Sequence, residues 1–378
     1  MPALETLSNH WNTIQRELFP CLEKELDAPL SERHKLFITV LDFAQIENFV
    51  RHWHGLPGRP QKDRQALARA FAAKPVFKIG QTKMLIERLQ VDKSLRRLCG
   101  WTFAFQIPSE ATFSRSFGEF AQSSLPVKMH AALVKATHKD RLVGHVSRDS
   151  TAIKAREKPV VKAKVEKPKG KPGRPKKGEE RPQKKRRLDR QQDMTLNEML
   201  ADLPTKCNVG SKRNSKGYKQ SWTGYKLHMD IADGGIPVSC VLTSASLHDS
   251  QVAIPLAEMT ARRTNNCYDL MDAAYDAPEI KQHSLSLGHV PIIDINPRSN
   301  KQLKRELSNE KRRLKRVGHK LAEDVRYNER STAERSNGRL KDEFGARHIW
   351  VRGNEKVMCH LMFGVLALTV DQLLKFVA

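Results

Sequence analysis

The pattern of apolar and polar positions divides the chain into a helical first part and a second part in which strands and helices alternate. Up to about residue 138, apolar residues recur at three- and four-residue spacing, which is typical of amphipathic helices. The predicted helices are Trp11–Leu26, Lys35–Trp53, Gln61–Ala73, Gln81–Val91, a short helix capped by Gly100, and a last one that begins at Glu110 with Ser109 as its N-cap. We therefore expect residues 1–138 to form an all-helical domain.

The last of these helices has two possible roles. The segment Ala111–Phe117 is small, polar and basic on one face, as a recognition helix that enters the major groove of DNA would be. It could equally be an ordinary amphipathic helix that packs through Phe113, Phe117 and Phe120. Periodicity does not separate the two, so DNA binding by residues 1–138 stays a possibility at this point.

From Leu142 onward, short apolar runs alternate with helical patterns. A hairpin is predicted where Asp233-Gly234-Gly235 joins two alternating runs. The predicted strands are Leu142–Thr151, Trp222–Ala232, Ile236–Ser244, Cys267–Asp272 and Val290–Ile295, and the predicted helices are 250–263, Pro278–Leu287, the strongly basic Lys301–Leu321, Tyr327–Lys341 and Val357–Phe376. This order predicts an α/β domain at 139–378, a mixed sheet flanked by helices.

A basic insertion interrupts the predicted domain at about residues 155–220. Between positions 154 and 190 the chain has 17 Lys/Arg and 5 Asp/Glu, a net of +12, with few apolar residues. Such a segment cannot bury enough surface to fold alone, so we predict that it is disordered. Within it, Lys171–Lys177 resembles an AT-hook, which would place Arg174 and Lys176 in an A·T-rich minor groove. A solvated linker with non-specific phosphate affinity is the alternative.

Composition narrows the class of partner. The 378 residues carry 67 Lys+Arg against 42 Asp+Glu, a net charge of +25, which indicates a polyanionic partner, nucleic acid before an anionic membrane. None of the six cysteines has CxxC spacing, so neither a zinc ribbon nor a disulfide framework is predicted, and we expect a cytoplasmic protein. The apolar run Leu361–Val370 is too short to span a bilayer, so no membrane partner is expected.

The predicted helix near the C-terminus carries a polar stripe where a packing helix would be apolar. Successive helical residues step by about 100°, which places Tyr327, Arg330, Glu334 and Lys341 within roughly 60° of one another. A carboxylate on such a face could hold a metal, and the flanking cations could hold phosphates.

Two upstream aspartates would complete a metal site with this helix. Asp149 and Asp272 are expected at the ends of two strands, and with Glu334 they would form three carboxylates. Such a set can hold two divalent ions that act on both oxygens of a phosphoryl transfer. Each residue also has a simpler interpretation: the aspartates could cap turns, and Glu334 could pair with Arg330 at i,i+4 spacing. Asp249 is interpreted as a helix N-cap.

These motifs resemble those of bacterial insertion-sequence DDE transposases, in the grouping around insertion sequences 4 and 5. Tyr327, Arg330, Glu334 and Lys341 fit the Tyr-xx-Arg-xxx-Glu-xxxxxx-Lys signature of that family without a spacing error. The other matching segments are Arg148–Thr151 for the first Asp motif, Met271–Asp276 for the second, with Ala273-Ala274 in place of the usual Lys-Gly, and Gly224–His228 and Leu247–Ser250 between them.

The resemblance implies a ribonuclease-H-like fold and DNA transposition. It implies that Asp149, Asp272 and Glu334 bind two Mg²⁺ or Mn²⁺ ions, that a phosphodiester at the element end is hydrolysed, and that the freed 3′-hydroxyl attacks target DNA. Arg330 and Lys341 would hold phosphates, while Tyr327 could contact a phosphate, stack on a flipped base or simply pack. The expected partners are double-stranded DNA and a second copy of the chain, at the nucleoid. The alternatives are a metal-dependent nuclease that does not join DNA, and a DNA-binding derivative without catalysis.

Overall fold

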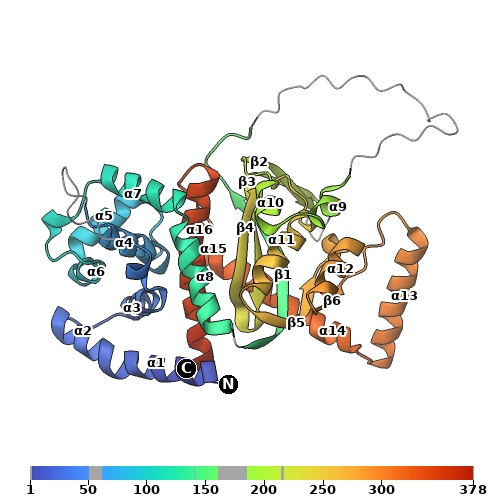
Figure 1. The fold of residues 1–378 in the computed structure, drawn as a ribbon, viewed down its shortest axis with the longest axis horizontal. Coiled ribbons are helices and arrows are strands. Elements are labelled where there is room, and N and C mark those ends of the chain that lie inside the picture. Colours follow the sequence, from blue (N-terminus) through green and yellow to red (C-terminus); the bar gives the residue numbers. More distant parts are fainter. Residues whose placement is uncertain (1, 51–61, 140, 161–184, 214–216, 378) are drawn as a thin grey trace.

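The computed structural model describes residues 2–50, 62–139, 141–160, 185–213 and 217–377. A lobe of N-terminal helices lies beside a helix-covered sheet, and the long helix α16 (Asn354–Val377) runs between them (Figure 1). The mixed sheet, its flanking helices and the helical N-terminal region are therefore as the sequence predicts.

The N-terminal lobe contains α1 (Pro2–Thr13), the π-helical η1 (Ile14–Leu18), α2 (Phe19–Leu26), α3 (Glu32–Ala44), η2 (Ile46–Asn48), α4 (Arg64–Val76), α5 (Thr82–Val91), α6 (Lys93–Cys99), η3 (Ala104–Gln106), α7 (Glu110–Gln122) and α8 (Leu125–His138). Helix α3 ends before the predicted point because Gln45 adopts a left-handed conformation with φ 44°. Gly100 caps α6 with φ 110°, as predicted. Ser109 occupies the N-cap position of α7, although its side chain makes no capping hydrogen bond.

Helix α7 packs through its aromatic face. The rings of Phe113, Phe117 and Phe120 are buried around Phe71 of α4, with centroids 5.7, 4.8 and 6.1 Å from it. Such tilted and edge-on pairs are favourable aromatic geometries. Packing therefore accounts for the phenylalanines, and only the opposite, exposed face with Arg115 would be free to contact DNA.

The six-stranded sheet is built around β1 (Leu142–Lys154). Its strands are β2 (Asn208–Arg213), β3 (Lys219–Ala232), β4 (Ile236–Ser244), β5 (Asn265–Met271) and β6 (Val290–Ile293). The order is β2-β3-β1-β5-β6, with β4 also paired to β3. The pairs β1–β3, β2–β3 and β3–β4 are antiparallel, whereas β1–β5 and β5–β6 are parallel. The predicted hairpin is present, and Gly234 and Gly235 supply positive φ at its turn.

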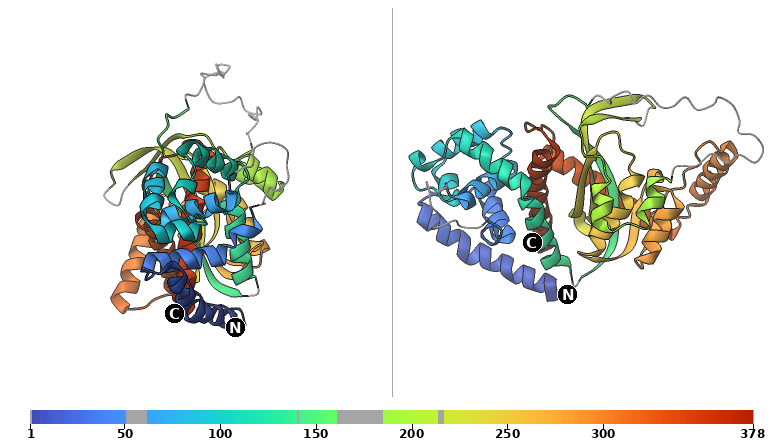
Figure 2. Two further views of the ribbon diagram at one scale, coloured as in Figure 1. Left: turned by 90° about the vertical axis from the view of Figure 1, so that its left-hand side faces the viewer. Right: turned by 45° about the horizontal axis from the view of Figure 1, so that its top comes forward.

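Helices cover both faces of the sheet (Figure 2). One face of β1 carries Arg148, which pairs with Asp230, and Asp230 also accepts a hydrogen bond from Thr260 of α11 (Ser250–Ala261). The other face carries Ser147 and Asp149, which bond to the segment of η6 (Asn328–Arg330) and α15 (Ser331–Asp342). Side chains alternate along a strand, so Asp149 faces the helix with the polar stripe.

Part of the segment predicted to be a disordered insertion is folded. Residues 185–213 fold into α9 (Arg187–Gln191), α10 (Leu196–Ala201) and β2, which corrects the predicted 155–220 boundary. The reason is that Leu188, Leu196 and Met199 are buried in a small core with Tyr275 and Ile280. The AT-hook-like segment with Arg174 and Lys176 lies outside the described residues.

Asp149 does not end its strand, contrary to the prediction. Strand β1 continues to Lys154, because β3 stays paired with it as far as Gly224. The backbone of Ala155 also donates to the carbonyl of Thr223, 3.0 Å away. Asp149 therefore lies in the middle of β1 and is level with the end of β5.

Helix α16 joins the two parts of the molecule. It contacts α3, α4, α7 and α8 on one side and β4 on the other. By length and composition α16 could cross a membrane, but 78% of its apolar window is buried in the protein, as in a core helix. One hydrophobic core therefore includes side chains from the helical lobe, α16 and the sheet.

The basic helix α13 (Lys301–Val317) and the short helix α14 (Ala322–Tyr327) lie on the side of the sheet away from the lobe (Figure 1). They follow α12 (Pro278–Ser286) and β6 in the chain. Neither α13 nor α14 has a buried residue. The polar stretch predicted as one helix is divided among the end of α14, the 3₁₀ turn η6 and α15.

Candidate active site

Two of the three predicted carboxylates, Asp149 and Asp272, lie side by side where β1 runs next to the end of β5. Strands β1 and β5 are parallel with Arg148 opposite Met271, so Asp149 and Asp272 occupy the next register position on the same face. Asp149 accepts a hydrogen bond from the amide nitrogen of Asn337 at 3.0 Å. Asp272 accepts from the backbone of Ala274 at 2.9 Å, so it caps the turn η5 (Ala273–Tyr275) as its simpler interpretation predicts.

Both aspartates bind protons more tightly than usual. Burial raises the pKa of Asp149 to about 6, helped by the negative charges of Asp272 and Asp249 and opposed by the backbone N–H of Ser150 and by Arg330. Burial also raises the pKa of Asp272, with Asp249 acting in the same direction. A bound divalent cation would favour the ionised forms of both, so the pair fits a metal site chemically.

Glu334 does not join this pair in the structure. It lies in the first turn of α15 with its side chain 58% exposed, and its Oε1 accepts a hydrogen bond from Arg330 at 2.7 Å. This i,i+4 pair is the simpler interpretation of Glu334. Within the described residues, no group of three or more His, Cys, Asp and Glu side chains is placed to hold a metal ion. The structure therefore brings Asp149 and Asp272 together, but not Glu334.

Arg330 is the positive charge common to all three carboxylates. It bonds Glu334 directly, and its charge lowers the pKa of both Asp149 and Asp272. Its guanidinium also lies 5.6 Å from the ring centre of Tyr327, within cation–π distance. In this structure Arg330 thus partly neutralises the site.

Tyr327 is held by an aspartate that follows strand β6. Its hydroxyl donates to Asp294 Oδ2 at 2.9 Å. Burial and this hydrogen bond both raise the pKa of Tyr327, so the phenol stays protonated at neutral pH. Tyr327 therefore lies beside the carboxylate pair as a neutral hydrogen-bond donor.

Sequence reasoning missed the role of Asp249. Asp249 occupies the predicted N-cap position of α11, but its side chain makes no capping hydrogen bond there and instead accepts from Lys226 Nζ at 2.9 Å. Burial alone would raise the pKa of Asp249, but His228 and Lys226 lower it. Burial lowers the pKa of His228 itself to about 4, so Lys226 supplies the positive charge at neutral pH. The sequence did hold a signal for this contact, because Lys226 and Asp249 both fall in segments that match the family pattern, Gly224–His228 and Leu247–Ser250.

A buried ion pair fixes the strands beneath the aspartates. The guanidinium of Arg148 makes two hydrogen bonds of 2.8 Å to the two carboxylate oxygens of Asp230, and both side chains are fully buried. Nη1 of Arg148 also lies 3.3 Å from the sulfur of Met271 on β5. Arg148 directly precedes Asp149 and Met271 directly precedes Asp272, so Arg148 links β1 to β3 through Asp230 and contacts β5 through Met271 next to the two aspartates.

The chain is similar to two families of known proteins. Residues 144–370 match the family described as "Transposase DDE domain", and this match spans more than half of the chain and all three predicted carboxylates. The chain belongs to the DDE transposase family. Residues 22–119 of the transposase match a second family, "Transposase domain (DUF772)". No curated protein and no solved structure matches the chain.

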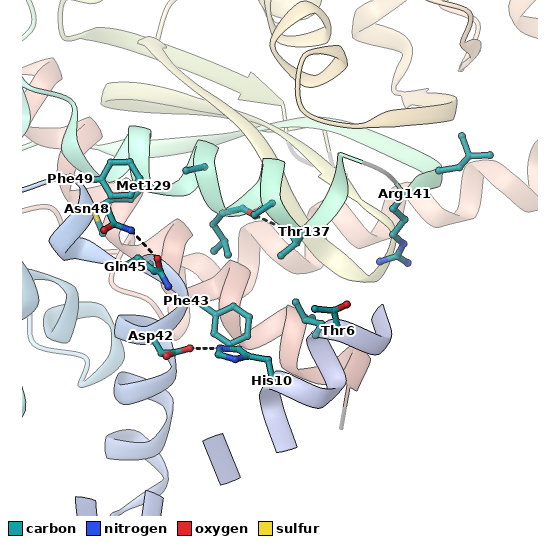
Figure 3. A pocket seen from close by; sticks show the side chains of 16 residues that line it. Thr6, His10, Asp42, Phe43, Gln45, Asn48, Phe49, Met129, Thr137 and Arg141 are labelled. Carbon is teal, nitrogen blue, oxygen red and sulfur yellow. Dashed lines mark hydrogen bonds and ion pairs between the residues drawn. The ribbon is translucent and has the colours of Figure 1, made fainter. Parts of the chain in front are cut away.

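One large cavity of this transposase lies away from the carboxylates. It has a volume of about 1020 Å³ and lies among α1, α3 and α8, where His10 and Asp42 form a 2.5 Å contact (Figure 3). None of the predicted site residues lines it. Metal-dependent phosphoryl transfer needs converging carboxylates rather than an enclosed cavity, so the position of this cavity does not count against the carboxylate pair.

Proposed function

We propose that this DDE transposase cleaves DNA at the ends of its element and joins the freed 3′-hydroxyl to target DNA. The observation that carries the proposal is the pairing of Asp149 and Asp272 on adjacent parallel strands, with Arg330 beside them. A ribonuclease-H-like assignment for residues 139–378 is supported by a hairpin antiparallel to β1 on one edge and parallel β5 and β6 on the other. We place the chain in the grouping around insertion sequences 4 and 5.

The carboxylates would hold Mg²⁺ or Mn²⁺. Asp149 and Asp272 would be the first ligands of two such ions, which would supply positive charge to stabilise the oxygens of the phosphoryl transfer. Glu334 would be the third ligand once it leaves Arg330. An exposed i,i+4 pair is worth only about 0.3–0.5 kcal/mol, so this exchange costs little.

The residues around the carboxylates would position the DNA. When Arg330 moves to a phosphate of the DNA, Glu334 is released for the metal site, which couples DNA binding to assembly of the site. Lys341, at the other end of α15, is close enough for Asp149 to act on its pKa and would hold a second phosphate. Tyr327 would donate a hydrogen bond from its hydroxyl to a phosphate oxygen, in place of the one it now donates to Asp294.

Double-stranded DNA is the proposed partner, bound by a dimer at the nucleoid in the cytoplasm. Helix α13 supports DNA binding, because its basic residues are exposed and the helix projects from the catalytic half (Figure 1). They are Lys301, Lys304, Arg305, Lys311, Arg312, Arg313, Lys315 and Arg316. For the helical lobe we propose a contribution to recognition of the element ends.

Incubation with element-end DNA and Mg²⁺ tests the proposed function, with nicking and strand joining scored separately. We expect both products from the wild type and neither from Asp149→Asn, Asp272→Asn or Glu334→Gln, while each variant still binds DNA. Glu329→Gln, an exposed neighbour on the same stretch, is the matched control and should stay active. Nicking without joining would identify a nuclease. Binding without either product in the wild type would identify a DNA-binding derivative.

A further inference from the structure

A second pocket opens farther along β1 than Asp149, where β1 extends beyond the end of β5. It has a volume of about 530 Å³ and lies between the end of β1 and the loop that follows α15. Its side chains include Lys154, Arg156, Lys341, Arg347, His348 and Trp350. Pockets that bind small molecules usually have about 300–1,000 Å³, so this one could hold a ligand the size of a nucleotide.

The pocket is strongly cationic. Arg347 pairs with Asp342, but no ion pair is found for Lys154, Arg156 or Lys341 among the described residues. Burial lowers the pKa of Lys341, and the nearby cations Lys212 and Arg347 lower it further. Like charges that crowd together in this way favour an anionic ligand.

An exposed indole lies among these cations. Trp350 is 42% exposed, and the guanidinium of Arg156 lies 4.8 Å from the centre of its ring. Both the indole and a guanidinium plane are surfaces on which nucleic-acid bases stack. Because Arg156 is itself exposed, a base can stack on its outer face or replace it, and Trp350 supports the base in both arrangements.

The surrounding backbone holds Trp350 in place. The indole packs against Gly80 of the helical lobe, where an added Cβ would lie 3.1 Å from its Nε1. The loop after Trp350 is tied to the β1 extension, because Glu157 accepts hydrogen bonds from the backbone of Gly353 and from the hydroxyl of Tyr225. The aromatic platform is therefore formed before any ligand binds, which lowers the cost of ordering on binding.

We propose that this pocket receives an unpaired nucleotide of the DNA strand that passes the active site. The base stacks on the Trp350–Arg156 pair, and Lys154 and Lys341 hold its flanking phosphates. A paired base has its faces covered by its neighbours, so only an unpaired one can use this platform. Lys154 lies five residues beyond Asp149 along β1, about 17 Å, which corresponds to about five nucleotides at the duplex rise of 3.4 Å. The inference rests on the proposed function only in taking DNA as the ligand.

The test measures binding without cleavage. The full chain is titrated, in EDTA, into a DNA duplex with a short single-stranded overhang that carries 2-aminopurine, and into the same duplex with blunt ends. We expect the wild type to quench the fluorescence of the overhang. Trp350→Ala should abolish the quenching and weaken binding of the overhang duplex by about 5- to 100-fold, with blunt-end binding little changed. Trp350→Phe should restore the quenching in part.

Controls separate a lost platform from lost folding. Phe105→Ala removes another exposed aromatic side chain, 83% exposed on the helical lobe, and should behave as the wild type. Arg156→Glu keeps the indole and reverses an exposed charge, so it reports on the pocket even where Trp350→Ala fails to fold. The proposal is overturned if Trp350→Phe and Arg156→Glu both bind the overhang duplex and quench its fluorescence as the wild type does. In that case Trp350→Ala would either also behave as the wild type or fail to fold.

This result is independent of the proposed function, because the assay has no cleavage step. A chain that never cuts element ends can still show the preference for the overhang, which would leave the pocket standing. Conversely, cutting and joining by the wild type, together with unchanged overhang binding in the variants, would refute the pocket and leave the proposed function intact.

Discussion

At the scale of single residues, the carboxylate pair is poorly neutralised in the absence of metal. The pKa of Asp149 is raised from 3.8 to about 6, so between these values the folded protein binds more protons here than the unfolded chain. The slope of the unfolding free energy with pH is then negative. Stability from this group is complete below about pH 4 and is lost as the pH rises through about 6.

We therefore predict that the unfolding free energy of metal-free Asp149→Asn falls less with rising pH than that of the wild type. Urea unfolding in EDTA at several values between pH 4 and 7 measures it, with the wild type compared with Asp149→Asn. The difference in unfolding free energy between the two should change in favour of the variant as the pH rises, because asparagine cannot ionise. The same pH dependence in both proteins would contradict the raised pKa of Asp149.

Arg330 provides a second prediction at this scale. Its guanidinium acts on Asp149 and Asp272 and bonds Glu334, so it opposes a metal ion electrostatically. Arg330→Ala should tighten Mn²⁺ binding, by about fivefold if the lost repulsion is about 1 kcal/mol. It should also reduce DNA cleavage, because the phosphate contact is lost.

Paramagnetic resonance of free Mn²⁺ measures the affinity, and a nicking assay measures the cleavage. Arg335→Ala on the same helix is the matched control, since Arg335 bonds Thr332 rather than a carboxylate. Weaker Mn²⁺ binding by Arg330→Ala would show that Arg330 organises the site and does not compete with the metal.

At the scale of the elements, the buried pair between β1 and β3 is the critical contact. Removing Asp230 leaves the Arg148 charge buried without a partner, and we predict that Asp230→Ala destabilises the protein by about 3–5 kcal/mol. Glu32→Ala breaks an exposed pair with Lys35 and should cost less than about 1 kcal/mol. Denaturant unfolding compares the two, and similar losses would show that Arg148 finds another partner.

The elements also show what the sequence can and cannot predict. Apolar periodicity predicts α5, the β3–β4 hairpin and α11 because each forms a local pattern that its own residues specify. The basic composition hides the apolar positions of α9 and α10, because buried Leu188 lies within the basic stretch and buried Leu196 lies just after it. The order of motifs indicates the carboxylates, but only the register of β1 against β5 brings Asp149 to Asp272.

Side-chain contacts across the site are beyond such patterns. The spacing of Arg330 and Glu334 allows both an ion pair and a metal site, and the choice depends on what else binds Arg330. Likewise, nothing local to Asp249 distinguishes a helix cap from a partner of Lys226, which lies on a strand 23 residues earlier. These contacts depend on the tertiary structure, where distant segments meet.

At the scale of the whole molecule, α16 makes the lobe and the sheet one structural unit. Its Gly364 packs closely against the loop after α15, since an added Cβ would lie 2.5 Å from the carbonyl oxygen of Phe344. We predict that Gly364→Ala destabilises lobe and sheet together, by about 1–3 kcal/mol, because the overlap involves backbone. Gly338→Ala is the matched control: a Cβ there meets nothing within 4 Å, so the helix should be slightly stabilised.

Hydrogen exchange followed by mass spectrometry tests this coupling, because it reports α4 and β3 separately in one experiment. Faster exchange in both elements for Gly364→Ala is the expected outcome. Faster exchange confined to one of them would mean that lobe and sheet open independently, despite their common core.

Long-range attraction to DNA also belongs to the whole molecule, because it depends on the summed charge of the chain. Residues 162–184 carry ten Lys/Arg and three Asp/Glu, so replacing them with a short Gly/Ser linker lowers the net charge from +25 to +18. DNA binding releases about 0.9 counterions for each phosphate that a cation neutralises.

If this segment contacts DNA, the deletion should weaken binding and reduce the slope of log affinity against log salt by several units. Reversing Arg174 and Lys176 alone should reduce it by about two. An unchanged slope in the deletion would assign the electrostatic contact to folded surfaces such as α13, whose charges the deletion leaves in place.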